Sequence, residues 1–269
     1  MSVRWSGDYC ELMGLDVDTL IHEIGAGQIG MDFLTGEPLA MADKLFYFKR
    51  TLREAALKHN MYATFMAKPL ADEPGSAMHL HQSVFDVRGE RNLFANPDGS
   101  PARSFYYFIS GLQRYITPAM ALVAPYVNSY RRLVRNTTAP INVQWGHDNR
   151  TVGFRVPGAA THERHVENRV IGANANPYLA FAVTLACGYL GMTEKIDPTA
   201  PTTGSGQSLH FELPQGLPQA LRGLRAEDKL KMVLGERFVD VYAAIKDQVH
   251  LEFMTVISPW EREHLLLHV

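Results

Sequence analysis

The sequence predicts an α+β fold, because strand-like and helix-like segments follow one another irregularly and no strand–helix unit repeats along the chain. Short segments of alternating apolar and polar residues indicate strands, whereas two longer segments, 37–60 and 104–123, carry apolar residues at helical spacing. The 269 residues are 46% hydrophobic and 20% charged, which is ordinary for a globular protein with a substantial core.

Local signals place the elements of the first third of the chain. Residues 8–13 have the character of a helix end, and Gly14 stands where a C-terminal cap is expected. Alternation and turn residues then predict two short strands around a glycine turn, a long amphipathic helix and one more strand, at 19–25, 28–34, 37–60 and 62–66.

The remaining elements follow from the same kinds of signal. Asn176 and Pro177 open an apolar helix, with proline at the first helical position. Ser258 and Glu261 form a capping box that begins the last helix. Strands are expected at 141–145, 152–156 and 162–169, a hairpin turn at 88–90, and surface loops at 128–139 and 197–215.

Charge and cysteine content exclude several classes of partner. The formal net charge of −2 argues against nucleic acid or an anionic membrane as the main partner. Only Cys10 and Cys187 are present, far apart in the sequence, which indicates a reducing compartment without a disulfide framework. Residues 1–8 lack the pattern of a signal peptide. We therefore expect a soluble, cytoplasmic protein.

The segment 74–83 is the first candidate for chemistry. Alternation places His79, His81 and Ser83 on one face of a strand, about 6.6 Å between alternate residues. Gly75, in the turn before the strand, lets the backbone approach a ligand closely. Two imidazoles and a hydroxyl on one face suit a metal–phosphate site. The alternative is an edge strand with two surface histidines, and this segment alone does not separate the two.

A second group of charged residues lies in strand-like segments. His165, Glu167 and Arg169 alternate on one face, while Arg150 and Arg155 flank another strand. Guanidinium groups beside carboxylates suit a nucleotide polyphosphate with its divalent cation, because arginine pairs with phosphate oxygens and glutamate and histidine hold the metal. The alternative is a set of surface salt bridges. Spacing does not decide between them.

Motifs that follow one another along the chain resolve the ambiguity. They are HEIGAGQ (22–28), KPLADEPGSAMHLHQS (68–83), NSYRRL (128–133), NRT (149–151), ENR (167–169), ANPY (175–178) and the closing ISPWE (257–261). Together they resemble the catalytic domain of the glutamine synthetase family, and in detail the branch of γ-glutamylputrescine and other γ-glutamyl-amine synthetases. The resemblance covers nearly the whole chain.

The resemblance implies a fold and a reaction. The fold would be a curved, largely antiparallel sheet flanked by helices, with residues 1–269 forming one catalytic domain. We expect the chain to be truncated, without the family's small N-terminal β-grasp domain. In the implied reaction, the γ-carboxylate of glutamate attacks the γ-phosphate of ATP, and ammonia or an amine such as putrescine then attacks the acyl phosphate. Mg²⁺ or Mn²⁺ would be required, and the family forms homo-oligomeric rings.

The resemblance also implies roles for metal and nucleotide residues. Glu23 matches a carboxylate that holds the metal near glutamate and is a catalytic residue. His79 and Glu167 match ligands of the second metal, which bridges the ATP phosphates. His81 and Ser83 match positions that line the nucleotide.

Further roles concern the substrates. Gly75 matches a position whose backbone contacts the substrate glutamate, and Arg132 and Arg169 match the arginines that bind its carboxylates. Arg150 matches the catalytic arginine that stabilises the transferring phosphoryl group and also contacts the nucleotide. Arg155 matches a second nucleotide arginine.

Three positions depart from the family pattern. Gly30 stands where the family has a further metal-binding glutamate, and His165 where it usually has a nucleotide arginine. Thr138 occupies the flap position at which ammonia-using enzymes carry a carboxylate, which favours a larger amine. Because two divalent cations need several anionic oxygens, we expect weak or no ligase activity from this chain.

Two other classes of function are weighed. The first is a non-catalytic relative that binds nucleotide or glutamate, which Gly30 and the expected truncation favour. The second is a phosphagen-kinase-like phosphotransferase with a similar catalytic fold, which the ordered motifs disfavour.

Overall fold

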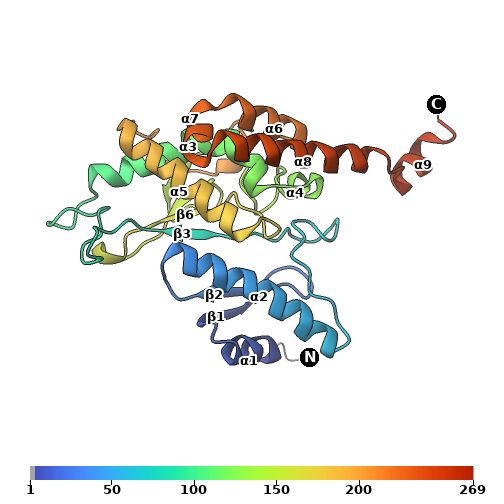
Figure 1. Ribbon diagram of the computed structural model, residues 1–269, viewed down its shortest axis with the longest axis horizontal. Helices are drawn as coiled ribbons and strands as arrows, with labels where there is room; N and C mark the ends of the chain where they lie inside the picture. Colours follow the sequence, from blue (N-terminus) through green and yellow to red (C-terminus); the bar gives the residue numbers. More distant parts are fainter. Residues whose placement is uncertain (1–3, 269) are drawn as a thin grey trace.

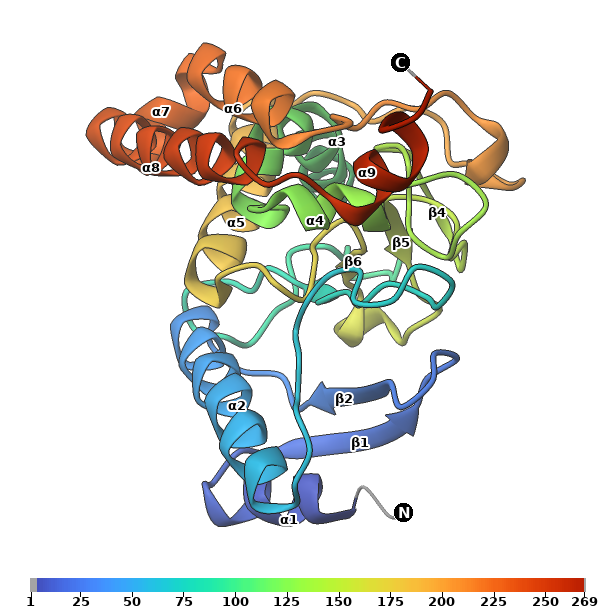
Figure 2. The ribbon, with the colours of Figure 1, turned by 90° about the vertical axis from the view of Figure 1, so that its right-hand side faces the viewer.

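The computed structural model describes residues 4–268, and its elements form three zones (Figures 1 and 2). At one end lie helix α1 (Arg4–Leu12), helix α2 (Pro38–Lys58) and the antiparallel hairpin of β1 (Val17–His22) and β2 (Ile29–Phe33). A small sheet occupies the middle, and helices cover its other side. The α+β class is therefore confirmed.

The middle sheet has four short strands in the order β3-β6-β5-β4. Strand β6 pairs antiparallel with β3 and β5, and β4 pairs parallel with β5, so the sheet is largely antiparallel as predicted. The order brings residues 80–82 next to residues 166–168, although more than eighty residues separate them in sequence. The strands are β3 (Leu80–Gln82), β4 (Trp145–His147), β5 (Phe154–Val156) and β6 (Val166–Asn168).

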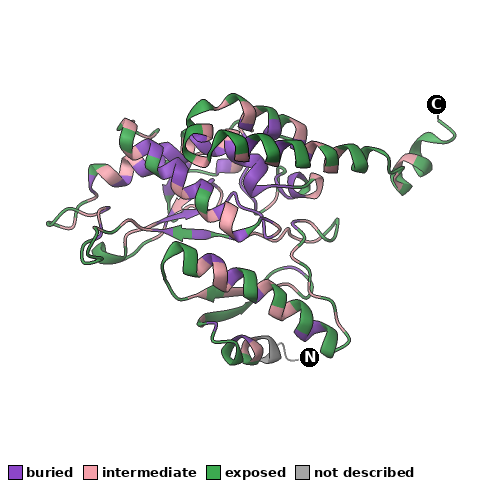
Figure 3. Cartoon of the chain, viewed as in Figure 1, coloured by how far each residue is buried: buried purple, intermediate pink, exposed green. Residues whose placement is uncertain are grey.

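The core lies where helix α3 (Arg103–Val123) crosses helix α5 (Pro177–Glu194). Both helices carry glycine at the crossing, and a Cβ atom on Gly111 would collide with the Cys187 carbonyl oxygen. The missing side chains let the two backbones approach closely. Figure 3 shows that the buried residues concentrate here and on the sheet, whereas α1 and the β1–β2 hairpin are mostly exposed.

Shorter elements complete the chain. Helix α4 follows α3, and two 3₁₀ turns, η1 and η2, lie in the connections. The described residues include no helix of the length and apolarity that a bilayer crossing requires. The bounds are α4 (Val127–Arg132), η1 (Thr161–Glu163), η2 (Gly206–Ser208), α6 (Leu217–Ala226), α7 (Asp228–Leu234), α8 (Glu236–Met254) and α9 (Pro259–Leu265).

Several local predictions are confirmed. Gly14 ends the first helix region with a φ of +67°, which glycine adopts without strain. The Asn176 side chain caps α5 by accepting a hydrogen bond from the Leu179 backbone N–H. The capping box of α9 is complete, because Ser258 and Glu261 each accept the other's backbone N–H.

Other local predictions are wrong in part. Residues 62–66 form no strand, and the Met66 N–H instead donates to the nearby Thr64 hydroxyl. The loop expected at 128–139 begins with helix α4, whose first turn is fixed by the Tyr126 N–H donating to Ser129 Oγ. The strand predicted at 141–145 shares only Trp145 with β4, because the Val143 N–H donates to the Glu212 carboxylate instead of to a strand. The strands predicted at 152–156 and 162–169 are reduced to the three residues of β5 and of β6, and the second begins with the 3₁₀ turn η1.

Candidate functional site

Glu167 on β6 is the centre of a buried charge cluster. Glu167 as a whole is only 2% exposed. Arg169 Nη1 donates to Glu167 Oε1 at 2.6 Å, and Arg155 Nη1 donates to Oε2 at 2.9 Å. His79 Nδ1 lies 3.1 Å from Oε1. We call Glu167, His79, Arg155 and Arg169 the Glu167 cluster. Pairing of β6 with β3 and β5 brings these residues together, whereas the alternation at 77–83 and 165–169 predicts only which of them share a face of their own strand.

The electrostatics of the cluster fix its protonation. Burial alone would raise the pKa of Glu167, but the His79 hydrogen bond and the Arg169 charge outweigh it and hold the pKa far below its ordinary range. His79 keeps 35% of its side chain exposed. Desolvation, aided by the positive charges of Arg169 and Arg132, lowers the pKa of His79, although Glu167 opposes this. At neutral pH the cluster therefore presents a charged carboxylate beside a neutral imidazole.

Arg155 extends the cluster to Asp148, which the sequence analysis missed. Its Nη2 donates to Asp148 Oδ1 at 2.9 Å, while Nη1 contacts Glu167. Asp148 also accepts the Gly158 N–H and stands at a φ of +46°, so a local turn positions its carboxylate. The signal that could have revealed it is the aspartate directly before the NRT motif, in a turn where Asp tolerates the left-handed conformation.

Arg132 and Gly75 form a second part of the site. Arg132 is 3% exposed, and its Nη2 donates to the Val170 carbonyl. A Cβ atom on Gly75 would lie 2.5 Å from Arg132 Cγ and 2.7 Å from the Ala67 carbonyl oxygen, so only glycine allows this approach. Burial, with Arg169 nearby, lowers the pKa of Arg132 to about 10. It nevertheless stays charged at neutral pH.

Unpartnered donors indicate what the site can bind. The Nε atoms of Arg132, Arg155 and Arg169 are buried and have no hydrogen-bond partner. Buried donors without partners are costly, so an acceptor that reaches them gains binding energy. Because all three belong to guanidinium groups, the fitting acceptor is an anion such as a carboxylate or a phosphate.

Glu23 lies apart from the cluster, on the exposed turn of the β1–β2 hairpin. Gln28 ties this turn to the Gly75 loop, since its Nε2 donates to the Gly75 carbonyl and to Ser76 Oγ, both at 3.2 Å. The Glu23 carboxylate leans across Gly30, where an added Cβ would lie 2.5 Å from Oε1. The site therefore joins an exposed hairpin to a buried cluster.

Other predicted site residues are less engaged. Arg150 is exposed, and the described residues form no hydrogen bond or ion pair with its side chain. Ser83 is partly buried on the predicted face. His81 is exposed and faces His165, with ring centroids 5.0 Å apart. These residues keep their predicted roles as hypotheses.

The metal-ligand assignment stays a prediction, with two of its residues in contact. His79 and Glu167 are in contact, and a neutral imidazole with a charged carboxylate is the form that binds a divalent cation. Among residues 4–268, however, no three His, Cys, Asp or Glu side chains lie close enough to hold an ion together. Any cation there would take most of its ligands from substrate oxygens and water.

Comparison with known proteins gives a consistent result. The model of the family "Glutamine synthetase, catalytic domain" matches residues 3–265. The γ-glutamylputrescine synthetase PuuA of Escherichia coli K12 is 36% identical over 263 residues, which cover 96% of this chain and 55% of that protein. A glutamine synthetase of Methanosarcina mazei is 34% identical over 276 residues, covering 98% and 61%, respectively.

A further relative and a solved structure extend the comparison. A glutamate–isopropylamine ligase of a Pseudomonas species is 33% identical over 259 residues, covering 94% of this chain and 56% of the ligase. The structure of a GmaS/ADP complex superposes with a TM-score of 0.88 at 30% identity, covering 98% of this chain and 63% of GmaS. The chain thus spans less than two thirds of the length of each of these proteins.

Proposed function

This chain belongs to the glutamine synthetase family of carbon–nitrogen ligases, and on that premise we propose that it carries the ATP-dependent joining of glutamate to an amine. The observation that supports the proposal most directly is the set of unpartnered guanidinium donors on Arg132, Arg155 and Arg169 around Glu167, whose lowered pKa keeps it ionised at neutral pH. An amino-dicarboxylate and a polyphosphate are both anions that such donors bind.

The residues divide between the two substrates. In this proposal, Arg132 and Arg169 bind the carboxylates of glutamate, beside the Gly75 backbone. Arg155, His81 and Ser83 line the nucleotide.

The γ-carboxylate of glutamate then attacks the γ-phosphorus of ATP, which breaks the bond to ADP and forms an acyl phosphate. The amine attacks the acyl carbon, loses a proton and displaces phosphate. Arg150 stabilises the negative charge that the transferring phosphoryl oxygens carry.

Mg²⁺ or Mn²⁺ has a defined place in the proposal. Glu23 would hold one ion near glutamate, and His79 with Glu167 would hold another near the phosphates. When bound, such ions neutralise phosphate charge and orient the transferring group. Glu167 itself is held by Arg155 and Arg169, so these arginines position the ligand as well as the substrates.

The amine is proposed to be larger than ammonium. Thr138 lies exposed in the 136–140 segment and offers no carboxylate to attract ammonium. The names of the E. coli and Pseudomonas relatives, which are amine ligases, support the same choice. We expect Thr138→Glu to shift preference from putrescine towards ammonium. Unchanged relative kcat/KM values for the two amines would contradict this assignment.

One observation favours a second candidate function. Gly30 supplies no carboxylate, and Glu23 leans over the place where a side chain would begin. A protein of this family that binds nucleotide or glutamate without turnover would tolerate that loss. A cytoplasmic location is also part of the proposal. Size-exclusion chromatography with light scattering measures whether this chain forms the homo-oligomer that its family forms.

Phosphate release tests the proposed function. The chain is incubated with ATP, glutamate, Mg²⁺ or Mn²⁺, and either putrescine or ammonium. Slow release that requires glutamate and an amine is the expected result, because Gly30 supplies no carboxylate to the metal site. A folded protein that binds ATP by calorimetry but releases no phosphate would support the non-catalytic candidate instead.

A further inference from the structure

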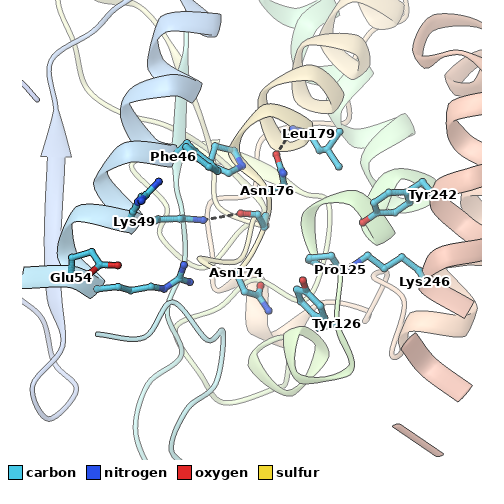
Figure 4. A pocket seen from close by; sticks show the side chains of 14 residues that line it. Phe46, Lys49, Glu54, Pro125, Tyr126, Asn174, Asn176, Leu179, Tyr242 and Lys246 are labelled. Atoms are coloured by element: carbon cyan, nitrogen blue, oxygen red, sulfur yellow. Dashed lines mark hydrogen bonds between the residues drawn. The ribbon is translucent and has the colours of Figure 1, made fainter. Parts of the chain in front are cut away.

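A cavity outside the candidate functional site is lined by an excess of positive charge. It measures about 560 Å³ and lies between helix α2, the segment 174–177 and helix α8 (Figure 4). No residue of the Glu167 cluster lines it, nor do Arg132 and Gly75. Its charged side chains are Lys49, Arg50, Arg53 and Lys246, with Glu54 as the single carboxylate. We call it the cationic pocket.

The cations of this pocket are not neutralised by the protein. None of the ion pairs among residues 4–268 includes any of the four. Lys49 donates to the carbonyl oxygens of Ala173 and Ala175, at 2.7 and 2.8 Å. Within the described part of the chain, the side chains of the other three donate no hydrogen bond. Their N–H groups are therefore free to bind a ligand.

Aromatic rings, rather than carboxylates, face three of the four cations. Lys49 Nζ and Arg53 Cζ lie 5.6 and 5.2 Å from the centroid of the Phe65 ring. Lys246 Nζ lies 4.0 Å from the centroid of Tyr126, at the α8 side of the pocket. A ring face attracts a cation but leaves its formal charge and its N–H groups available.

Among the four cations of the pocket, Lys246 gives the strongest indication that an anion binds there. The residue is only 9% exposed, yet its ammonium group faces Tyr126 and Tyr242 rather than an acid. Burying a cation without a counter-ion is costly, and the cost falls when an anion enters. Burial also lowers the pKa of Lys246, and burial with the Arg53 charge lowers the pKa of Lys49 to about 8.

We propose that the cationic pocket binds a small multivalent anion, carrying either phosphate groups or several carboxylates. Its volume lies in the range of sites for small molecules, and its net charge of three suits an anion of two or more charges. The rings of Phe46, Tyr126 and Tyr242 give such a ligand an apolar wall. The inference is independent of the proposed ligase reaction, because no residue is shared.

Calorimetric titration of the chain, with EDTA present to remove divalent cations, tests the proposal. The probes are pyrophosphate, citrate and, as a monovalent reference, acetate. The pocket variant combines Arg53→Gln with Lys246→Met, which keeps the apolar stem of the lysine. The control combines Lys58→Gln with Arg237→Gln, which changes net charge equally on the same two helices outside the pocket.

The expected result is at least tenfold weaker binding of one or both multivalent anions in the pocket variant and unchanged binding in the control. Loss for pyrophosphate alone identifies a phosphate ligand, and loss for citrate alone a polycarboxylate. Equal loss in both variants, no binding by the unaltered chain, or acetate affinity equal to that of the others would overturn the proposal.

Arg53→Gln alone separates binding from folding, because this exposed side chain makes no hydrogen bond or ion pair in the described structure. It should weaken binding about threefold.

Discussion

The two halves of the candidate site are held in opposite ways. In the Glu167 cluster, Glu167 and Arg169 are buried, and each oxygen of the Glu167 carboxylate accepts a hydrogen bond from an arginine. The β1–β2 hairpin that carries Glu23 is largely exposed, and two hydrogen bonds from Gln28 connect it to the Gly75 loop. The ion pairs of the Glu167 cluster fix its side chains before any ligand binds, whereas the position of the β1–β2 hairpin depends on a few solvent-accessible hydrogen bonds.

This difference predicts where mutations affect stability and where they affect only function. Removing a member of the buried cluster leaves charged groups without partners, so folding and activity fall together. Altering the hairpin exposes little new polar surface, so activity or ligand affinity should change with less effect on folding. The predictions below run from the largest expected effect to the smallest.

Glu167→Ala should have the largest effect. It leaves the Arg155 and Arg169 guanidinium groups buried without their shared carboxylate, which we expect to cost about 3–5 kcal/mol of unfolding free energy. Phosphate release should fall about 100-fold or more. Urea unfolding and the release assay measure the two effects. The matched control is Glu163→Ala, an exposed glutamate near the same strand whose ion pair with His162 spans 3.7 Å.

The same substitution should change the pH dependence of stability. Because the pKa of folded Glu167 lies below the ordinary 4.5, its contribution is complete above that value and is lost as the pH falls towards the folded pKa. The unaltered chain should therefore lose stability on acidification more steeply than Glu167→Ala. Parallel stability curves between pH 5 and the acid limit would contradict the assigned pairing.

Gly75→Ala tests the contact between the two halves. The added Cβ would lie 2.7 Å from the Ala67 carbonyl oxygen, which is backbone and moves little, so we expect a loss of about 1–3 kcal/mol. Displacement of Arg132 should also raise the KM for glutamate more than that for ATP. Gly204→Ala is the control, because nothing lies within 4 Å of its added Cβ. Equal effects of the two substitutions would show that the close approach is unimportant.

Features that depend on neighbouring residues could be predicted from the sequence, whereas features that depend on contacts between distant segments could not. Alternation at 77–83 predicted correctly that His79 lies on the strand face opposite Met78 and Leu80. Both apolar residues are buried, and the pattern that predicts this is visible in neighbouring residues of the sequence. The prediction of a strand at 62–66 is wrong because a strand requires a neighbouring strand to pair with, and in the described structure residues 62–66 pair with none. Asp148 was missed because its position before the NRT motif indicates only a turn, whereas its contact with Arg155 across that turn is not visible in the neighbouring residues.

Gln28→Ala should weaken the link between hairpin and loop without disturbing the core. It removes three side-chain hydrogen bonds of ordinary length, two to the Gly75 loop and one from the Gly25 N–H, so we expect about 1–2 kcal/mol of lost stability and faster amide exchange across residues 17–33. Gln248→Ala is the control, since in the described structure the one hydrogen bond of that exposed side chain goes to Glu252 of its own helix. Unchanged exchange in the hairpin would mean that strand pairing and the Ala26–Glu73 hydrogen bond suffice to position Glu23.

Gly30→Glu should have the smallest effect on folding and the most specific effect on ligand binding. The new Cβ meets Glu23 Oε1 at 2.5 Å, but that atom ends a flexible, exposed side chain that can turn aside at little cost. Two carboxylates on one hairpin bind a hard divalent cation better than one, so we expect Mn²⁺ affinity to rise about tenfold.

Electron paramagnetic resonance titration of free Mn²⁺ measures this change in affinity, with Gly30→Gln as a control that adds similar bulk without charge. If Gly30→Gln raised affinity equally, the gain would come from bulk, and the hairpin would not hold a metal. If only the glutamate variant gained affinity, the exposed half of the site would be a metal-binding half limited by its missing carboxylate.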